Sequence, residues 1–127
     1  MPAVTGTCQI EQRDYMGEPA LLFRWTCTAG GICQYNVEFP IVGVLSRLIT
    51  RPMDTPTDSY DIVITTPDGI DVLQGKGADR DTANTEVVSL RFDSDPKTGF
   101  VVNDYVQFAV SNAGASKNGL AILTFER

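Results

Sequence analysis

The stretch from Leu21 to Thr28 reads Leu-Leu-Phe-Arg-Trp-Thr-Cys-Thr and alternates large apolar residues with more polar ones. Successive side chains of a β-strand point to opposite faces, so every second residue from Leu21 to Cys27 falls on one apolar face. The opposite face carries Arg24 and the threonines. This pattern predicts a strand that packs one face against a core.

The same alternation recurs at residues 60–65, 88–92 and 106–110, next to clusters of Gly, Pro, Asn and Asp. A further candidate strand covers residues 36–50, where Phe39-Pro40 and Gly43 suggest an edge or a bulge. About seven or eight short strands at this spacing predict an all-β fold, an antiparallel β-sandwich, with a small β-barrel or jelly roll as the alternative. The length of 127 residues predicts one domain, residues 1–127.

Two runs are apolar on both faces, Leu120 to Phe125 and Ile41 to Leu45. Such a strand lies either at the centre of a sheet or against another chain, because one sandwich face cannot cover both of its sides. We therefore expect a homo-oligomer. The candidate protein-protein contact residues in these runs are Leu120, Ile122, Phe125, Ile41, Val42 and Val44.

Charge and histidine content narrow the classes of function. The net charge of -6 would repel DNA phosphates and anionic lipid, so we expect neither nucleic acid nor a membrane as a partner. Histidine is absent, which removes the usual general base near neutral pH and every Ser-His or Cys-His catalytic pair. The sequence therefore favours a protein that is not an enzyme and that uses no cofactor.

The cysteines are candidates for a zinc site or a disulfide, and the acidic loops are candidates for a calcium site. Cys8, Cys27 and Cys33 lack a zinc-binding spacing, and Cys27 and Cys33 either pair across a short turn or fill apolar space. No secretory signal precedes them, so we expect assembly in a cytoplasm. The acidic segment from Asp68 to Glu86 is of the oxygen-rich kind that can hold calcium, but its spacing does not fit the EF-hand loop, and in the shorter Asp93-Ser94-Asp95 run Lys97 occupies the third ligand position. Acid-rich turns are usually solvated, so we expect no metal, with calcium at Asp68 to Glu86 as the alternative.

One region carries a recognisable motif. It reads Pro56-Thr57-Asp58-Ser59-Tyr60-Asp61-Ile62-Val63-Ile64, then Asp68-Gly69-Ile70-Asp71-Val72-Leu73-Gln74-Gly75-Lys76-Gly77-Ala78-Asp79-Arg80 and on to Glu86, with Val110-Ser111-Asn112-Ala113-Gly114-Ala115-Ser116-Lys117-Asn118-Gly119 near the C-terminus. These residues resemble a family of small structural proteins of tailed bacteriophage virions. The resemblance covers about the last 70 residues and departs from the family pattern at Thr66-Pro67, where an acid commonly stands.

The resemblance implies a virion protein without enzymatic activity, assembled in the host cytoplasm. The length and acidity of this chain fit a capsid decoration or cement protein. Such a protein contacts the major capsid protein or other virion proteins and stabilises the head shell. A minor tail or neck subunit at the head-tail connector fits equally. Because proteins that decorate shells often sit on three-fold sites, the resemblance slightly favours a trimer.

Two further hypotheses concern glycines and tyrosines. Gly75 and Gly77 are candidate contact residues, since glycine allows either a positive φ or a close approach to a neighbouring chain. The alternative is a β-turn that follows a strand at residues 70–73. Tyr15, Tyr35 and Tyr60 suggest a surface-displayed module that binds glycans or the host, although Tyr60 alternates with apolar residues and is expected to be buried.

Overall fold

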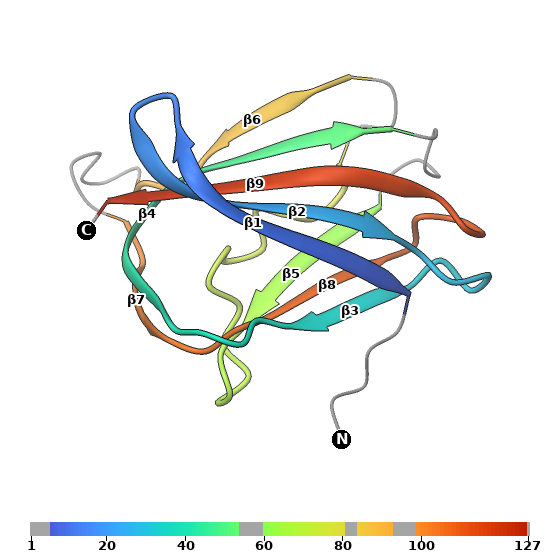
Figure 1. Ribbon diagram of the computed structural model, residues 1–127, viewed down its shortest axis with the longest axis horizontal. Coiled ribbons are helices and arrows are strands. Elements are labelled where there is room, and N and C mark those ends of the chain that lie inside the picture. Colours follow the sequence, from blue (N-terminus) through green and yellow to red (C-terminus); the bar gives the residue numbers. More distant parts are fainter. Residues whose placement is uncertain (1–5, 54–59, 81–83, 93–98, 127) are drawn as a thin grey trace.

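The computed structural model describes residues 6–53, 60–80, 84–92 and 99–126, and it confirms an antiparallel β-sandwich (Figure 1). The described residues contain two packed sheets and no helix. The strands are β1 (Thr7–Tyr15), β2 (Glu18–Thr26), β3 (Cys33–Asn36), β4 (Ile41–Pro52), β5 (Asp61–Thr65), β6 (Glu86–Ser89), β7 (Val101–Asp104), β8 (Gln107–Ser111) and β9 (Asn118–Glu126).

The larger sheet has the order β1-β2-β9-β4-β6, and β7 pairs with β4 beside β6. The smaller sheet has the order β3-β8-β5. Strand β4 is long enough to serve two neighbours on one side: its first residues pair with β7 and its later residues pair with β6. A bulge between Leu45 and Arg47 separates these two halves and bends the strand.

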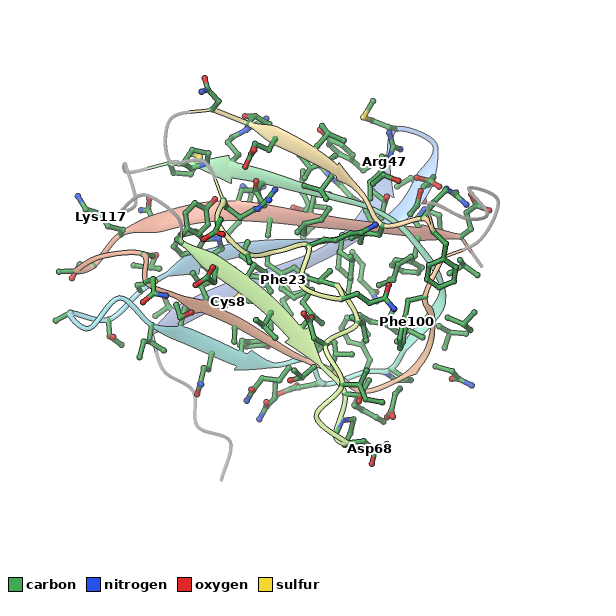
Figure 2. The ribbon with its side chains drawn as sticks, turned by 180° about the vertical axis from the view of Figure 1, so that it is seen from behind. Cys8, Phe23, Arg47, Asp68, Phe100 and Lys117 are labelled. Atoms are coloured by element: carbon green, nitrogen blue, oxygen red, sulfur yellow. The ribbon has the colours of Figure 1, made fainter. Side chains whose placement is uncertain are left out.

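The core lies between the two sheets, and contacts between aromatic side chains join the sheets there. Phe23 of β2 stacks on Phe108 of β8 with ring centroids 4.3 Å apart (Figure 2 labels Phe23). Beside them, Trp25 lies 5.5 Å from the ring of Tyr60. All four aromatic side chains are buried, which confirms the inward face predicted for residues 21–27.

The C-terminal strand β9 lies between β2 and β4, which confirms its predicted central position. One face, including Leu123 and Phe125, packs into the core between the sheets. The other face, including Leu120 and Ile122, joins a second, smaller cluster with Leu22 and neighbouring residues on the outer face of the larger sheet. Burial on both faces explains why this strand carries no alternating pattern.

Three sequence expectations need correction. Strands β1 and β7 were not predicted, because both are edge strands with polar or exposed residues in most positions. The expected strand at residues 36–50 begins only at Ile41, as β4, while Asn36 is the last residue of β3 in the other sheet; the bulge lies at Ser46 and not at Gly43. Residues 70–73 form no strand: Asp71 makes an isolated bridge to Thr65, and a turn begins at Val72.

Within the described residues, the fold has no helix of the length and hydrophobicity that a membrane crossing requires.

Replacing Phe23 with Ala should lower the free energy of unfolding by about 3–5 kcal/mol, because the change leaves a cavity and removes the stack on Phe108. Urea denaturation followed by tryptophan fluorescence measures this loss. Val87→Ala is the control, since Val87 is 63% exposed and should change stability by less than about 0.5 kcal/mol. Equal effects of the two substitutions would contradict the central role of the aromatic stack.

Candidate functional site

Residues 66–80 fold against the free edge of β5, and we name this segment the edge loop. The amide of Val72 donates to the carbonyl oxygen of Ile64 over 2.8 Å, and the amide of Ile62 donates to Gly77 over 2.8 Å. The amide of Arg80 donates in the same way to Tyr60. An unpaired strand edge can recruit another chain, so the edge loop protects the smaller sheet on this side.

Asp71 organises the turn of the edge loop. Its Oδ1 accepts a hydrogen bond from the amide of Leu73 over 3.0 Å, and its Oδ2 accepts one from Gly75 over 2.9 Å. Val72 and Leu73, which follow Asp71, are buried in the core between the sheets. The carboxylate thus fixes the backbone that inserts these two apolar side chains.

The two candidate glycines of the edge loop have different roles. Gly75 has a φ of +80° and an exposed position with nothing nearby that a Cβ would meet. A Cβ on Gly77 would lie only 2.1 Å from the carbonyl oxygen of Ile62, so the close approach that Gly77 allows is to β5 of its own chain. Lys76, between them, donates from Nζ to the carbonyl oxygens of Ser89 and Arg91 and thereby ties the edge loop to the larger sheet.

The acidic side chains near the edge loop accept hydrogen bonds from the protein. Asp61 accepts the amide of Asp79 at 2.9 Å and the side-chain amide of Asn112 at 2.8 Å. Among the described residues, no group of three or more His, Cys, Asp or Glu side chains is placed to hold a metal ion. Asp81 and the run from Asp93 to Asp95 lie outside the described residues.

Exposed valines lie next to each other on the paired strands β4 and β7. Val44 faces Val101 across these strands, and Val42 on the same face is opposite Asn103. Val42 is 51% exposed and Val101 is 68% exposed, while Val44 is half-buried. We name Val42, Val44 and Val101 the valine surface. It lies on the side of the larger sheet that faces away from the core.

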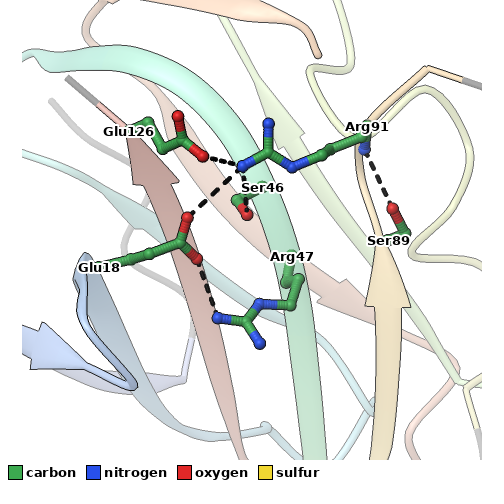
Figure 3. A network of polar contacts seen from close by, with 6 residues as sticks. All are labelled: Glu18, Ser46, Arg47, Ser89, Arg91 and Glu126. Carbon is green, nitrogen blue, oxygen red and sulfur yellow. Dashed lines mark hydrogen bonds and ion pairs between the residues drawn. The ribbon is translucent and has the colours of Figure 1, made fainter. Parts of the chain in front are cut away.

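Figure 3 shows a network of charged side chains that includes Glu18, Arg47, Arg91 and Glu126. Arg47 on β4 donates to Glu18 on β2 over 2.9 Å, and Arg91 reaches both Glu18, at 3.6 Å, and Glu126. Arg91 also donates to the hydroxyl of Ser46 over 3.2 Å. Because Glu126 lies opposite Val44 in the register of β9 and β4, the network and the valine surface are continuous.

Glu18 is held ionised by this network. Burial alone would raise the pKa of its carboxyl group, but hydrogen bonds from Arg47 and Ser46 oppose it and hold the pKa below the usual value near 4.5. The exposed side chains of Met16 and Val87 line an open groove together with Glu18, Arg47 and Arg91. Arginine and methionine flanked by apolar residues are typical of protein-protein interfaces.

The structure divides the predicted contact residues into two groups. Val42 and Gly75 are exposed and Val44 is half-buried, so they are available to a partner. The others are covered within one chain: Leu120, Ile122, Phe125, Ile41 and Gly77. The sequence analysis missed Val101 and the Glu18 network, and only the paired valines at 101 and 102 gave a local signal of a strand there.

The tyrosines suggested as glycan-stacking residues are not exposed platforms. Tyr60 is fully buried against Trp25, and Tyr15 and Tyr35 are partly buried against the apolar clusters. Tyr105, which the sequence analysis did not single out, is 52% exposed. It lines an open groove with Asn36, Thr65, Gln107 and their neighbours.

The three cysteines are free thiols, and Cys8 and Cys33 contact each other. The hydrogen bond from Cys8 lowers the pKa of Cys33 and raises the pKa of Cys8 itself. Burial raises the pKa of Cys27 to about 12. Cys33 also donates from Sγ to the carbonyl oxygen of Thr7 over 3.4 Å. Cys27 and Cys33 are therefore not joined in this structure, although the sequence left their pairing open.

No protein-family model matches the chain, and a search of curated proteins finds no match either.

Replacing Gly77 with Ala should lower the free energy of unfolding by about 1–3 kcal/mol or more, because the new methyl group collides with the backbone of β5. Gly30→Ala is the matched control: its nearest neighbour would be 3.7 Å away and its φ is not positive, so its stability should change by less than about 1 kcal/mol. Thermal denaturation of both variants tests the packing of the edge loop. A neutral Gly77→Ala would contradict it.

The lowered pKa of Glu18 predicts a specific dependence of stability on pH. As pH falls below about 4.5, the unfolded chain takes up a proton at Glu18 before the folded chain does, so the free energy of unfolding falls. Glu18→Gln removes this proton linkage and should make that fall shallower, and at pH 7 it should cost about 1–2 kcal/mol. Urea denaturation from pH 7 to pH 3 measures both effects, with the exposed Glu38→Gln as control. An unchanged slope in Glu18→Gln would contradict the network.

Proposed function

We propose that this protein is a structural component of a tailed-bacteriophage virion, most specifically a decoration or cement protein on the head shell. The proposal rests on the resemblance of residues 56–86 and 110–119 to small phage virion proteins and on the valine surface. The role is not catalytic. The major capsid protein, or another virion protein, is the proposed partner.

The valine surface is the observation that carries the proposal. Val42 and Val101 are β-branched apolar side chains that project from two neighbouring strands into solvent. Covering each of them fully would contribute about 1.5–3 kcal/mol, which alone gives weak binding. Many identical contacts on a symmetric shell would make such weak binding stable through avidity.

The charges around the valine surface fit the same role. An interface typically has an apolar centre and a polar rim, and here Glu126 and Arg91 lie beside Val44. Because Glu18 and Glu126 both pair with Arg91, this rim is ordered before a partner arrives. An ordered surface loses less conformational entropy on binding than a mobile one.

Self-association belongs to the proposal as well. We propose a homo-oligomer, with a trimer preferred because shell decorations of the resembled family often occupy three-fold sites. The valine surface is then shared between a second copy and the shell. Light scattering of the purified protein should give a mass above the 13.8 kDa of one chain. A chain that remains monomeric at high concentration would restrict assembly to the particle surface.

Substitution of the valine surface should abolish attachment to the particle without unfolding the protein. Val42→Asp and Val101→Asp place a charge where apolar contact is needed, and each should weaken attachment at least about 10-fold. Co-sedimentation with particles assembled without this protein measures attachment, and circular dichroism verifies folding. Ile70→Asp is the matched control, since Ile70 is also exposed, at 49%, but lies on the edge loop. Wild-type attachment by both valine variants would contradict the proposed surface.

Copy number separates the head from the neck and tail. Quantitative mass spectrometry of purified virions should find tens to hundreds of copies per particle, as expected from the symmetry of a closed shell. About six or twelve copies would instead assign the protein to the neck or tail. Absence from the particle would contradict the proposal altogether.

A further inference from the structure

One side of the sandwich is closed by Lys76 and the edge loop, and the opposite side is where β1 meets β3. Strand β1 is the edge of the larger sheet and β3 is the edge of the smaller sheet, and they approach each other near the start of both strands (Figure 1). A Cβ on Gly6 would lie 3.4 Å from the Cα of Cys33 and 3.2 Å from the carbonyl oxygen of Ile32. The backbone before Cys8 therefore packs directly against the backbone at Cys33.

Two cysteines lie at this junction. Cys8 is on the inward face of β1, opposite Trp25 of β2, and is half-buried (Figure 2 labels Cys8). Cys33 is fully buried at the start of β3, and its Sγ lies 3.4 Å from the carbonyl oxygen of Thr7, the residue before Cys8. Cys8 packs against the apolar core cluster that contains Cys33. The two cysteines therefore stand on adjoining backbone segments, as a disulfide requires.

We propose that Cys8 and Cys33 form a reversible disulfide that fastens the two sheets on the side away from the edge loop. The oxidant is a small soluble disulfide, such as oxidised glutathione. The oxidant can reach half-buried Cys8 but not fully buried Cys33, so Cys8 is the first to react. Cys8 gives up its proton, and its sulfur attacks the S–S bond of the oxidant, forms a mixed disulfide and releases one thiolate. The Cys33 thiolate then attacks Sγ of Cys8, which forms the Cys8–Cys33 bond and releases the second thiolate. The two protons from the cysteines end on the two released thiols.

Two features favour a Cys8–Cys33 bond over a Cys27–Cys33 bond: the exposure of the thiols to an oxidant and the positions that the bond would join. Cys8 is half-buried and can reach a soluble oxidant, whereas Cys27 is 4% exposed. A Cys27–Cys33 bond would join residues on either side of one short turn, while the Cys8–Cys33 bond closes a loop of about 25 residues and links two sheets. The longer loop restricts the unfolded chain more and so stabilises the fold more.

The disulfide has a specific use if the proposed function holds. A virion assembles in a reducing cytoplasm, where both thiols stay reduced, and leaves it for oxidising surroundings, where the bond forms. The two sheets would then be fastened on both sides only after release. The chemistry of the bond does not depend on this use, so the two can fail separately.

Peptide mapping of the purified protein tests the pairing. After incubation with oxidised glutathione, alkylation and trypsin digestion, the proposal expects the peptide of residues 1–13, with Cys8, linked to the peptide of residues 25–47, with Cys33. Because Cys27 lies in the second peptide, Cys27→Ala must keep the link, and Cys33→Ser must lose it. A link that disappears in Cys27→Ala, or a closed bond within residues 25–47, would overturn the proposal. So would recovery of Cys8 alkylated in full.

Thermal stability provides a second readout that needs no particle. Oxidation should raise the melting temperature by about 10 °C, and dithiothreitol should reverse the rise. Cys8→Ser, at a half-buried position, should fold but show no rise, while Cys27→Ala should show the full rise. An equal rise in Cys8→Ser would overturn the proposal. The same peptides are then mapped from purified virions that are alkylated without reduction. This measurement shows whether the bond is present in released particles, independently of whether it can form in the purified protein.

Discussion

The contact between the two sheets through Phe23 and Phe108 is the constraint on which the rest of the structure depends. Each sheet has one apolar face that is stable only when the other sheet covers it, and the stacked rings lie where the two faces meet. The pair of Trp25 and Tyr60 extends this contact. The edge loop and Lys76 hold the two sheets in this position on one side of the sandwich.

Different contacts close the two open sides of the sandwich. On one side, the edge loop supplies backbone hydrogen bonds to β5, and Lys76 reaches across to the larger sheet. On the other side, β1 and β3 meet where Cys33 Sγ lies 3.4 Å from the carbonyl oxygen of Thr7. The residues of the edge loop have structural roles, because Asp71 organises the turn and Gly77 permits its close approach to β5. The contact surface that we propose lies elsewhere.

The proposed contact surface lies on the outer side of the larger sheet, where the valine surface adjoins charges already paired with each other. Glu18, Arg47 and Arg91 come from three separate parts of the chain, so their order depends on the whole fold. A partner that covers the valines would find a rim that is already rigid, which favours specific binding through a small apolar area. A repetitive particle is the setting in which so small an area suffices.

The sequence by itself determined the strands that alternate and the face of each that points inward, because alternation reports burial locally: Phe23, Trp25 and Ile62 were placed correctly. It did not determine β1 or β7, whose edge positions leave them without an apolar face of this kind. The tertiary structure alone decided which strands are neighbours. Alternation carries no information on pairing between distant segments, so the exposure of Val42 beside β7, the burial of Leu120 and the approach of the backbone before Cys8 to Cys33 followed only from the packed sheets.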